Sequence, residues 1–119
     1  MEGIIILAHG SKKKDTEEIA QSLARKVKIN FQDPIKLAFL QLSDSTIEKA
    51  VAELYETGVR VFKIVPMFIF DGIHITEDIP SELDRIKDIY KDITIKLGRC
   101  IGDDDKLAEI VTERINELC

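Results

Sequence analysis

Apolar residues along the chain fall into short continuous runs and into longer segments with helical spacing. Residues 3–8 form a continuous apolar run, which is typical of a strand that is buried on both faces of a sheet. Shorter runs at residues 34–40, 59–65 and 93–97 predict three further strands. After each run, apolar residues recur at three- and four-residue intervals, which predicts an amphipathic helix. The pattern therefore predicts four strands that alternate with four helices.

Local signals predict where the first two helices begin and end. Asp15 and Glu18 have the spacing of a capping box at the start of the first helix. Ser45 and Glu48 have the same spacing before the second helix, which Gly58 is suited to end.

The third helix is expected to begin near Glu77 and Asp78, whose carboxylates suit a first helical turn. Residues 103–105 lead into the fourth helix. The first and fourth helices are each expected to turn an apolar stripe inward, namely Ile19, Ala20, Leu23, Ala24 and Val27 in the first, and Leu107, Ile110, Val111, Ile115 and Leu118 in the fourth.

Strands that alternate with helices predict right-handed crossovers and a parallel sheet with helices on both faces, so we expect one three-layer α/β domain over residues 1–119. The first strand is the most apolar and should be central, which gives the strand order 2-1-3-4. Successive strands are then added in opposite directions on either side of the boundary between the first and third strands, so that the strand order reverses there. Ligands bind at such a reversal, beyond the carboxyl ends of the strands.

The only two histidines of the chain follow those two strands. His9 ends the first apolar run, and His74 lies in the segment after the third. Two neutral imidazoles that meet in the crevice would suit a divalent metal or proton transfer near neutral pH. The alternative interpretation is two unrelated loop histidines.

Composition excludes several classes of function. A net charge of −5 argues against general nucleic-acid binding, which needs a basic surface. No apolar run approaches the length of a membrane span, and the N-terminus does not resemble a signal peptide. Cys100 and Cys119 are too few and too poorly spaced for a disulfide framework or a zinc site. We therefore expect a cytoplasmic protein.

Other chemistries near His9 have weaker support. Gly10 is not part of a phosphate-binding glycine motif, and Ser11 does not lie in a nucleophile elbow. Ala8 stands where a histidine phosphatase would need an arginine. Residues 12–14 are three lysines, which would either attract a substrate with several carboxylates or form a solvated loop without a role.

Taken in order, several segments resemble the class II sirohydrochlorin chelatases in their small, single-domain form. The resemblance rests on residues 9–11, 38–42, 66–74, 78–80 and 101–104, and so covers nearly the whole chain. It implies the insertion of a divalent metal into sirohydrochlorin, a tetrapyrrole with eight carboxylates. It also implies a homodimer, because longer relatives carry two such domains in one chain.

The same resemblance implies roles for individual residues. His9 and His74 would be the metal ligands, and His9 would also accept protons. Gln41 departs from the pattern, because many relatives have a glutamate there, and an amide is a poorer ligand. The substrate-binding residues implied are Gly10, Ser11, Lys12, Gln41, Asp44, Ile69, Phe70, Asp71, Gly72, Ile73 and His74.

By this resemblance the metal is a substrate and not a retained cofactor. Cobalt(II) is expected first and nickel(II) next, in the biosynthesis of a tetrapyrrole cofactor such as cobalamin, with iron for sirohaem as an alternative. Two other classes stay open: a carrier that binds metal or tetrapyrrole without turnover, which Gln41 favours, and a structural or regulatory subunit.

Overall fold

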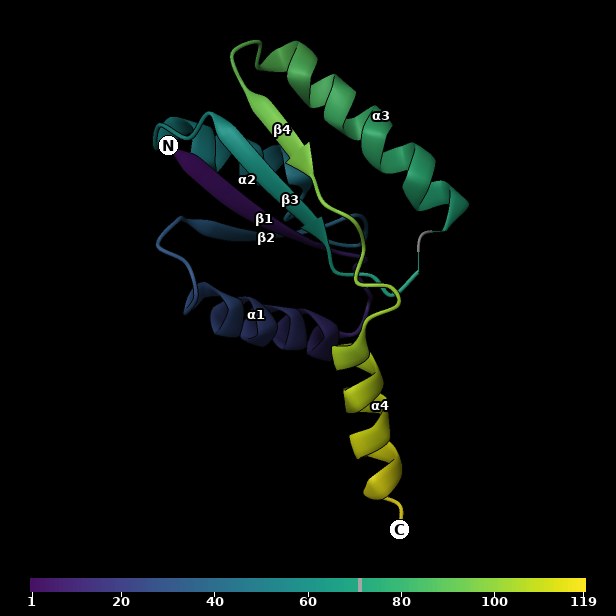
Figure 1. Cartoon of the computed structure of the whole chain (residues 1–119). Coiled ribbons are helices and arrows are strands. Elements are labelled where there is room, and N and C mark those ends of the chain that lie inside the picture. Colours follow the sequence, from purple (N-terminus) through teal and green to yellow (C-terminus); the bar gives the residue numbers. More distant parts are fainter. Residues whose placement is uncertain (71) are drawn as a thin grey trace.

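The predicted alternation of strands and helices is present in the computed structural model (Figure 1). The structure describes residues 1–70 and 72–119, with the backbone alone described at residues 73–76. The elements in chain order are β1 (Glu2–Ala8), α1 (Lys14–Lys28), β2 (Ile35–Phe39), α2 (Ile47–Glu56), β3 (Val61–Pro66), α3 (Ile73–Ile89), β4 (Thr94–Leu97) and α4 (Asp105–Asn116).

The four strands form one parallel sheet with the order β2-β1-β3-β4, as the sequence predicted. β1 is central and pairs with β2 on one side and β3 on the other, so that Leu7 lies opposite both Ala38 and Pro66. Residues 3–8 are buried, because both faces and both edges of β1 are covered. The carboxyl ends of β1 and β3 therefore lie side by side.

The main core lies on the face of the sheet that α2 and α3 cover. Ile5 and Phe62 point to this face and are completely buried. α1 covers the other face, where Ala20 of the helix packs with Ala8 of β1 and Phe39 of β2. The predicted arrangement of helices on both faces is thus confirmed (Figure 1).

Two predicted helix starts near the site were wrong. α1 begins at Lys14 with Lys13 at its N-cap, so Asp15 lies inside the first turn and does not cap it. α3 begins at Ile73, four residues before Glu77, and continues through Pro80. Glu77 and Asp78 therefore lie within the helix and not in its first turn.

The second helix start was wrong by one residue. Thr46, and not Ser45, occupies the N-cap of α2, and its hydroxyl accepts a hydrogen bond from the Lys49 N–H at 3.2 Å. The predicted end of this helix is confirmed, because Gly58 follows the C-cap residue with a φ of +104°. Glycine adopts that conformation without steric cost.

The expected inward face of α4 is on the surface. Within α4, which the structure describes in full, no residue is buried, and Ile110, Val111 and Ile115 are 45%, 53% and 58% exposed. Figure 1 shows α4 projecting away from the sheet.

No helix among the described residues is long and apolar enough to cross a membrane.

Candidate functional site at the carboxyl edge of the sheet

His9 lies at the carboxyl end of the central strand, as predicted, and its side chain is exposed. Its ring rests against the ring of Phe68, with a distance of 4.4 Å between the centroids. Phe68 follows β3 and is itself only 4% exposed. A buried ring from the neighbouring strand's loop therefore supports the imidazole and leaves it open to solvent.

The loops after β1 and β2 are held together by their backbones. The Leu40 N–H donates to the Ala8 carbonyl at 3.0 Å, and the Gln41 N–H donates to the His9 carbonyl at 3.1 Å. Gly10 has a φ of +93°, and a Cβ added there would lie 1.9 Å from the Gln41 carbonyl oxygen. The close approach of these loops therefore requires glycine at position 10.

A groove of about 690 Å³ opens beside His9. One end is formed by the loops after β1 and β3, and the other runs along α1. The lining residues are Ala8, His9, Gly10, Thr16, Ile19, Ala20, Leu23, Met67, Phe68, Ile69, Phe70 and Gly72. Most of these side chains are apolar, so the groove suits a ligand with a largely apolar surface.

Five of the predicted site residues line this groove, and they come from two loops. His9 and Gly10 follow β1, whereas Ile69, Phe70 and Gly72 lie between β3 and α3. The structure therefore brings these two segments together, as predicted from the strand order.

Other predicted residues are not among the described residues that line the groove. Gln41 and Asp44 are exposed on the loop after β2. The Ser11 hydroxyl accepts a hydrogen bond from the Lys13 N–H at 3.1 Å, which agrees with a local turn role and not with a nucleophile. Lys12, three residues after His9, is exposed.

His74 was expected in a loop, but it lies in the first turn of α3. Gly72, which is the N-cap of α3 and lines the groove, precedes it by two residues. Asp71 and the side chains of Ile73 and His74 lie outside the described residues. The predicted pairing of the two imidazoles therefore stays a prediction.

The described residues contain no cluster of three histidine, cysteine or carboxylate side chains that could hold a metal. Among them, His9 is the metal-ligating side chain that lines the groove. A site with few nitrogen ligands would bind a borderline divalent ion and still release it, whereas a thiolate cage would retain it.

Sequence reasoning missed the contribution of α1 to the groove. Ile19 and Leu23 were expected to face the core, but they are 62% and 41% exposed and line the groove with Thr16. Within α1, which the structure describes in full, only Ala20 is buried. Helical spacing identified the apolar stripe of α1, but it carried no information on how much of that stripe other elements cover.

Comparison with known proteins places this geometry in a family. The CbiX family model matches residues 3–118. The sirohydrochlorin cobaltochelatase of Sulfurisphaera tokodaii is 31% identical over 118 residues, which are 99% of this chain and 94% of that protein. The sirohydrochlorin ferrochelatase of Priestia megaterium is 30% identical over 118 residues, which are 98% of this chain but 44% of that protein. The chain thus spans less than half of some relatives and nearly all of others.

Solved structures show the same fold. A CbiX protein from Marinobacter aquaeolei, described as a putative cobalamin biosynthesis protein, matches with a TM-score of 0.85 and 26% identity over 98% of this chain and 93% of that chain. The sirohydrochlorin chelatase SirB from Bacillus subtilis subspecies spizizenii, in complex with cobalt, matches with a TM-score of 0.91 and 26% identity. That match covers 98% of this chain and 50% of the SirB chain.

Proposed function

The chain belongs to the CbiX family, and we propose that it is a sirohydrochlorin chelatase, which inserts a divalent metal into this tetrapyrrole. His9 carries the proposal, because its exposed imidazole stands at the rim of a mostly apolar groove at the carboxyl edge of the sheet. The curated relatives named above, which act on sirohydrochlorin by name, support the choice of substrate.

In this proposal the groove holds the macrocycle and His9 acts on its centre. Ile69 and Phe70, which are 47% and 80% exposed, offer apolar surface to the face of the ring. The imidazole of His9 accepts pyrrole protons, because a ring nitrogen of histidine is a common general base. It also binds the incoming ion, which is a substrate and leaves with the product.

His74 is the proposed second ligand. The first turn of α3 starts at the rim of the groove, since its N-cap Gly72 is a lining residue. Asp71 and Ile73 are proposed substrate contacts because the family resemblance implies them. A second copy of the chain, with its groove turned toward the first, would supply the other wall for a flat ligand and a second pair of histidines.

Cobalt(II) is the proposed metal, with nickel(II) next and iron(II) as the alternative. Neutral imidazole accepts all three ions, so the ligand type does not discriminate among them. The relatives include both a cobaltochelatase and a ferrochelatase by name. Initial rates with each ion at equal concentration would identify the preferred one, and the expected order is cobalt, nickel, iron.

The decisive experiment replaces each histidine by alanine. Purified protein is mixed with sirohydrochlorin and cobalt(II), and the loss of the free-tetrapyrrole spectrum is followed. His9→Ala and His74→Ala should each lose nearly all acceleration over the uncatalysed rate. The exposed Gln21→Ala on α1 is the matched control and should keep the wild-type rate. If either histidine variant keeps close to full activity, the proposed site is wrong.

Gln41 favours one further candidate function, a carrier that binds metal or tetrapyrrole without turnover. An amide at this position cannot act as a base, and it lies directly beside His9 through the backbone hydrogen bond between the two loops. The same assay separates the two functions with substrate in large excess. An enzyme consumes the whole pool, whereas a carrier stops at a stoichiometric amount.

A further inference from the structure

Leu42, in the loop after β2, has a backbone conformation that leucine seldom adopts. Its φ is +57°, and within the part of the chain that the structure describes it is the one residue other than glycine with a positive φ. In this left-handed region a Cβ lies too close to the following carbonyl oxygen. Asparagine and aspartate offset part of that cost with a local hydrogen bond, whereas leucine has no polar group to do so. The backbone at Leu42 therefore destabilises the folded chain.

Hydrogen bonds on both sides of Leu42 hold the backbone in this conformation. Before it, the Gln41 N–H is bonded to the loop after β1. After it, the Ser45 N–H donates to the Ser43 hydroxyl at 3.1 Å, and the Phe39 N–H donates to the Ser45 carbonyl at 2.8 Å. Because these bonds fix the chain on either side, the turn falls at Leu42 and the surrounding structure maintains the strain.

The Leu42 side chain gains little from packing within its own chain. The residue is 57% exposed, so contacts inside the fold do not offset the cost of its backbone. A glycine would adopt the same φ without that cost. Single exposed aliphatic residues are ordinary, but an exposed aliphatic residue on a strained backbone is not, and such strain gathers at functional sites. The stability of the fold therefore gives no reason for a leucine here.

Leu42 lies next to the groove that carries His9. The carbonyl oxygen of the peptide between Gln41 and Leu42 is the atom that a Cβ at Gly10 would meet at 1.9 Å, and Gly10 lines the groove. Since β1 lies between β2 and β3 in the sheet, the loops after β2 and β3 stand on the two sides of His9. Leu42 thus lies on the β2 side of His9, and Phe70 lies on the β3 side.

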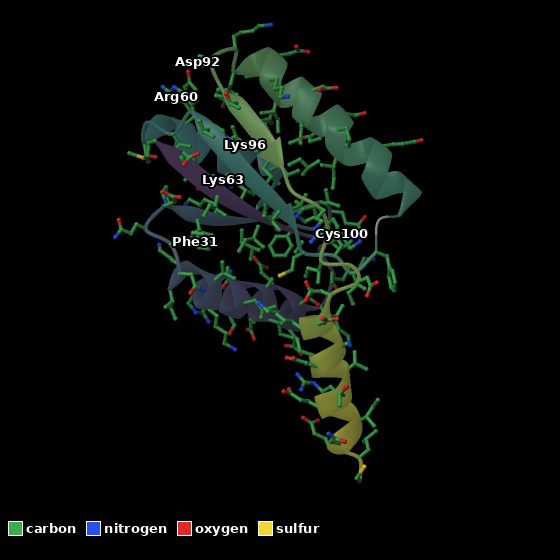
Figure 2. The ribbon with its side chains drawn as sticks, in the orientation of Figure 1. Phe31, Arg60, Lys63, Asp92, Lys96 and Cys100 are labelled. Atoms are coloured by element: carbon green, nitrogen blue, oxygen red, sulfur yellow. The ribbon has the colours of Figure 1, made fainter. Side chains whose placement is uncertain are left out.

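The loop on the β3 side is braced by the link after β4. The Ile101 N–H donates to the Phe68 carbonyl at 2.8 Å, and the Cys100 thiol donates to the Ile69 carbonyl at 3.8 Å. Figure 2 shows Cys100 at this edge of the sheet. The apolar surface of Ile69 and Phe70 is therefore in place on one side of His9 before a ligand arrives, and such preorganisation favours binding.

We propose that Leu42 is a further substrate-contact residue, whose side chain supports the tetrapyrrole on the β2 side of His9. The inference rests on the proposed function, because it takes sirohydrochlorin as the ligand. A macrocycle centred at His9 extends to both sides of it, and Ile69 and Phe70 serve the β3 side. Leu42 supplies apolar contact on the other side, where its strained backbone holds it. It neither accepts protons nor binds metal, so its loss weakens substrate binding and leaves the chemical step unchanged.

Urea unfolding of the free protein tests the strain. Leu42→Gly should raise the urea midpoint by about 0.5 M, because glycine adopts a positive φ without steric cost. Leu42→Ala keeps a Cβ, and should give no increase. A midpoint for Leu42→Gly at or below that of the wild type would show that the leucine stabilises the fold, and would overturn the proposal.

Titration of sirohydrochlorin without metal, followed by its absorption spectrum, tests the contact. Leu42→Gly and Leu42→Ala should each bind about tenfold more weakly, which corresponds to the burial of about 50 Å² of apolar surface. Leu42→Met keeps an apolar side chain of similar volume and should bind like the wild type. The matched control is Phe31→Ala, because Phe31 is 48% exposed but lies before β2, at the opposite edge of the sheet (Figure 2). It should also bind like the wild type.

Kinetics and mass separate this contact from other roles. With cobalt(II), Leu42→Ala should raise KM about tenfold and leave kcat within about twofold of the wild type. A loss of kcat at unchanged KM overturns the proposal. Light scattering should give this variant the wild-type mass, and a change would instead assign Leu42 to a contact between copies.

The titration also distinguishes failure of this inference from failure of the proposed function. If the wild type and Leu42→Ala bind sirohydrochlorin equally well, the inference is wrong and the proposed function stands. If the wild type does not bind sirohydrochlorin, the proposed function is wrong and the inference falls with it.

Discussion

Replacing Gly10 by alanine should destabilise the protein and disturb the loop that carries His9. Gly10 has a φ of +93°, and an added Cβ would lie 1.9 Å from the Gln41 carbonyl oxygen. Real Cβ atoms do not approach other heavy atoms closer than 3.0 Å, so that oxygen must move by about an ångström. The movement would stretch or break the hydrogen bond from the Gln41 N–H to the His9 carbonyl.

The magnitude follows from three separate costs. A left-handed backbone at a residue with a Cβ costs about 1–2 kcal/mol. Forcing atoms apart in a packed contact costs about 1–3 kcal/mol. Losing one hydrogen bond between the loops costs about 0.5–1.5 kcal/mol. We therefore expect Gly10→Ala to lower the free energy of unfolding by about 2.5–6.5 kcal/mol, a large part of the stability of a small domain.

Gly58→Ala is the matched control, because it isolates the backbone cost. Gly58 also has a positive φ, of +104°, but nothing lies within 4 Å of its added Cβ. It should cost about 1–2 kcal/mol. Urea unfolding followed by circular dichroism gives both values, provided that the slopes with denaturant agree. If Gly10→Ala costs no more than Gly58→Ala, the two loops do not contact each other as described, and the support of His9 by Gln41 is refuted.

Three further predictions concern the site and the fold. Gln41→Glu should give equal or greater metallation rates, because a carboxylate beside His9 adds a ligand and a base; a sharp loss would assign a role to the amide itself. Replacing residues 12–14 by glutamine should weaken sirohydrochlorin binding mainly at low salt, because exposed charges act through a screened field; identical salt profiles for variant and wild type would leave the lysines without a role. The Tyr55 hydroxyl donates to Asp92 at 2.8 Å and lowers the pKa of that carboxyl group. The ionised form is thus favoured on folding, and its contribution to stability is present above the unfolded pKa of about 3.9 and lost as pH falls through the folded value. Asp92→Asn should therefore lower stability at neutral pH and flatten its acid dependence below about pH 4 in urea titrations, and an unchanged acid slope would contradict a stabilising role for this hydrogen bond.

The sequence determined the order of the elements and the topology of the sheet. The apolar run at residues 3–8 required a strand covered on both sides, and the alternation with helices left a parallel sheet with right-handed crossovers. Those rules placed the segments after β1 and β3 at one edge, which is where His9, Ile69 and Phe70 line the groove. Local patterns suffice here because strand burial and crossover handedness are properties of short segments.

Helix boundaries were decided by geometry that short patterns do not contain. The first turn of α3 starts right after Gly72, whose extended backbone begins the helix without a side-chain cap, and acidic residues farther on gave a misleading signal. His74 was expected in a loop for the same reason. The capping boxes at Asp15 and Ser45 failed because the N-cap of α1 lies two residues before Asp15, at Lys13, and the N-cap of α2 lies one residue after Ser45, at Thr46.

Only the tertiary structure decided which apolar surfaces are covered and which loops touch. Spacing identified the stripes of α1 and α4, but burial depends on where each helix points. The link at residues 98–104 sets that direction for α4 by backbone hydrogen bonds to Ile64 of β3 and to Phe68 in the loop after it. The contact between Gly10 and Gln41 likewise joins residues 31 positions apart in the sequence. Distances of this kind arise from how separate elements pack together, and no local pattern of residue types encodes them.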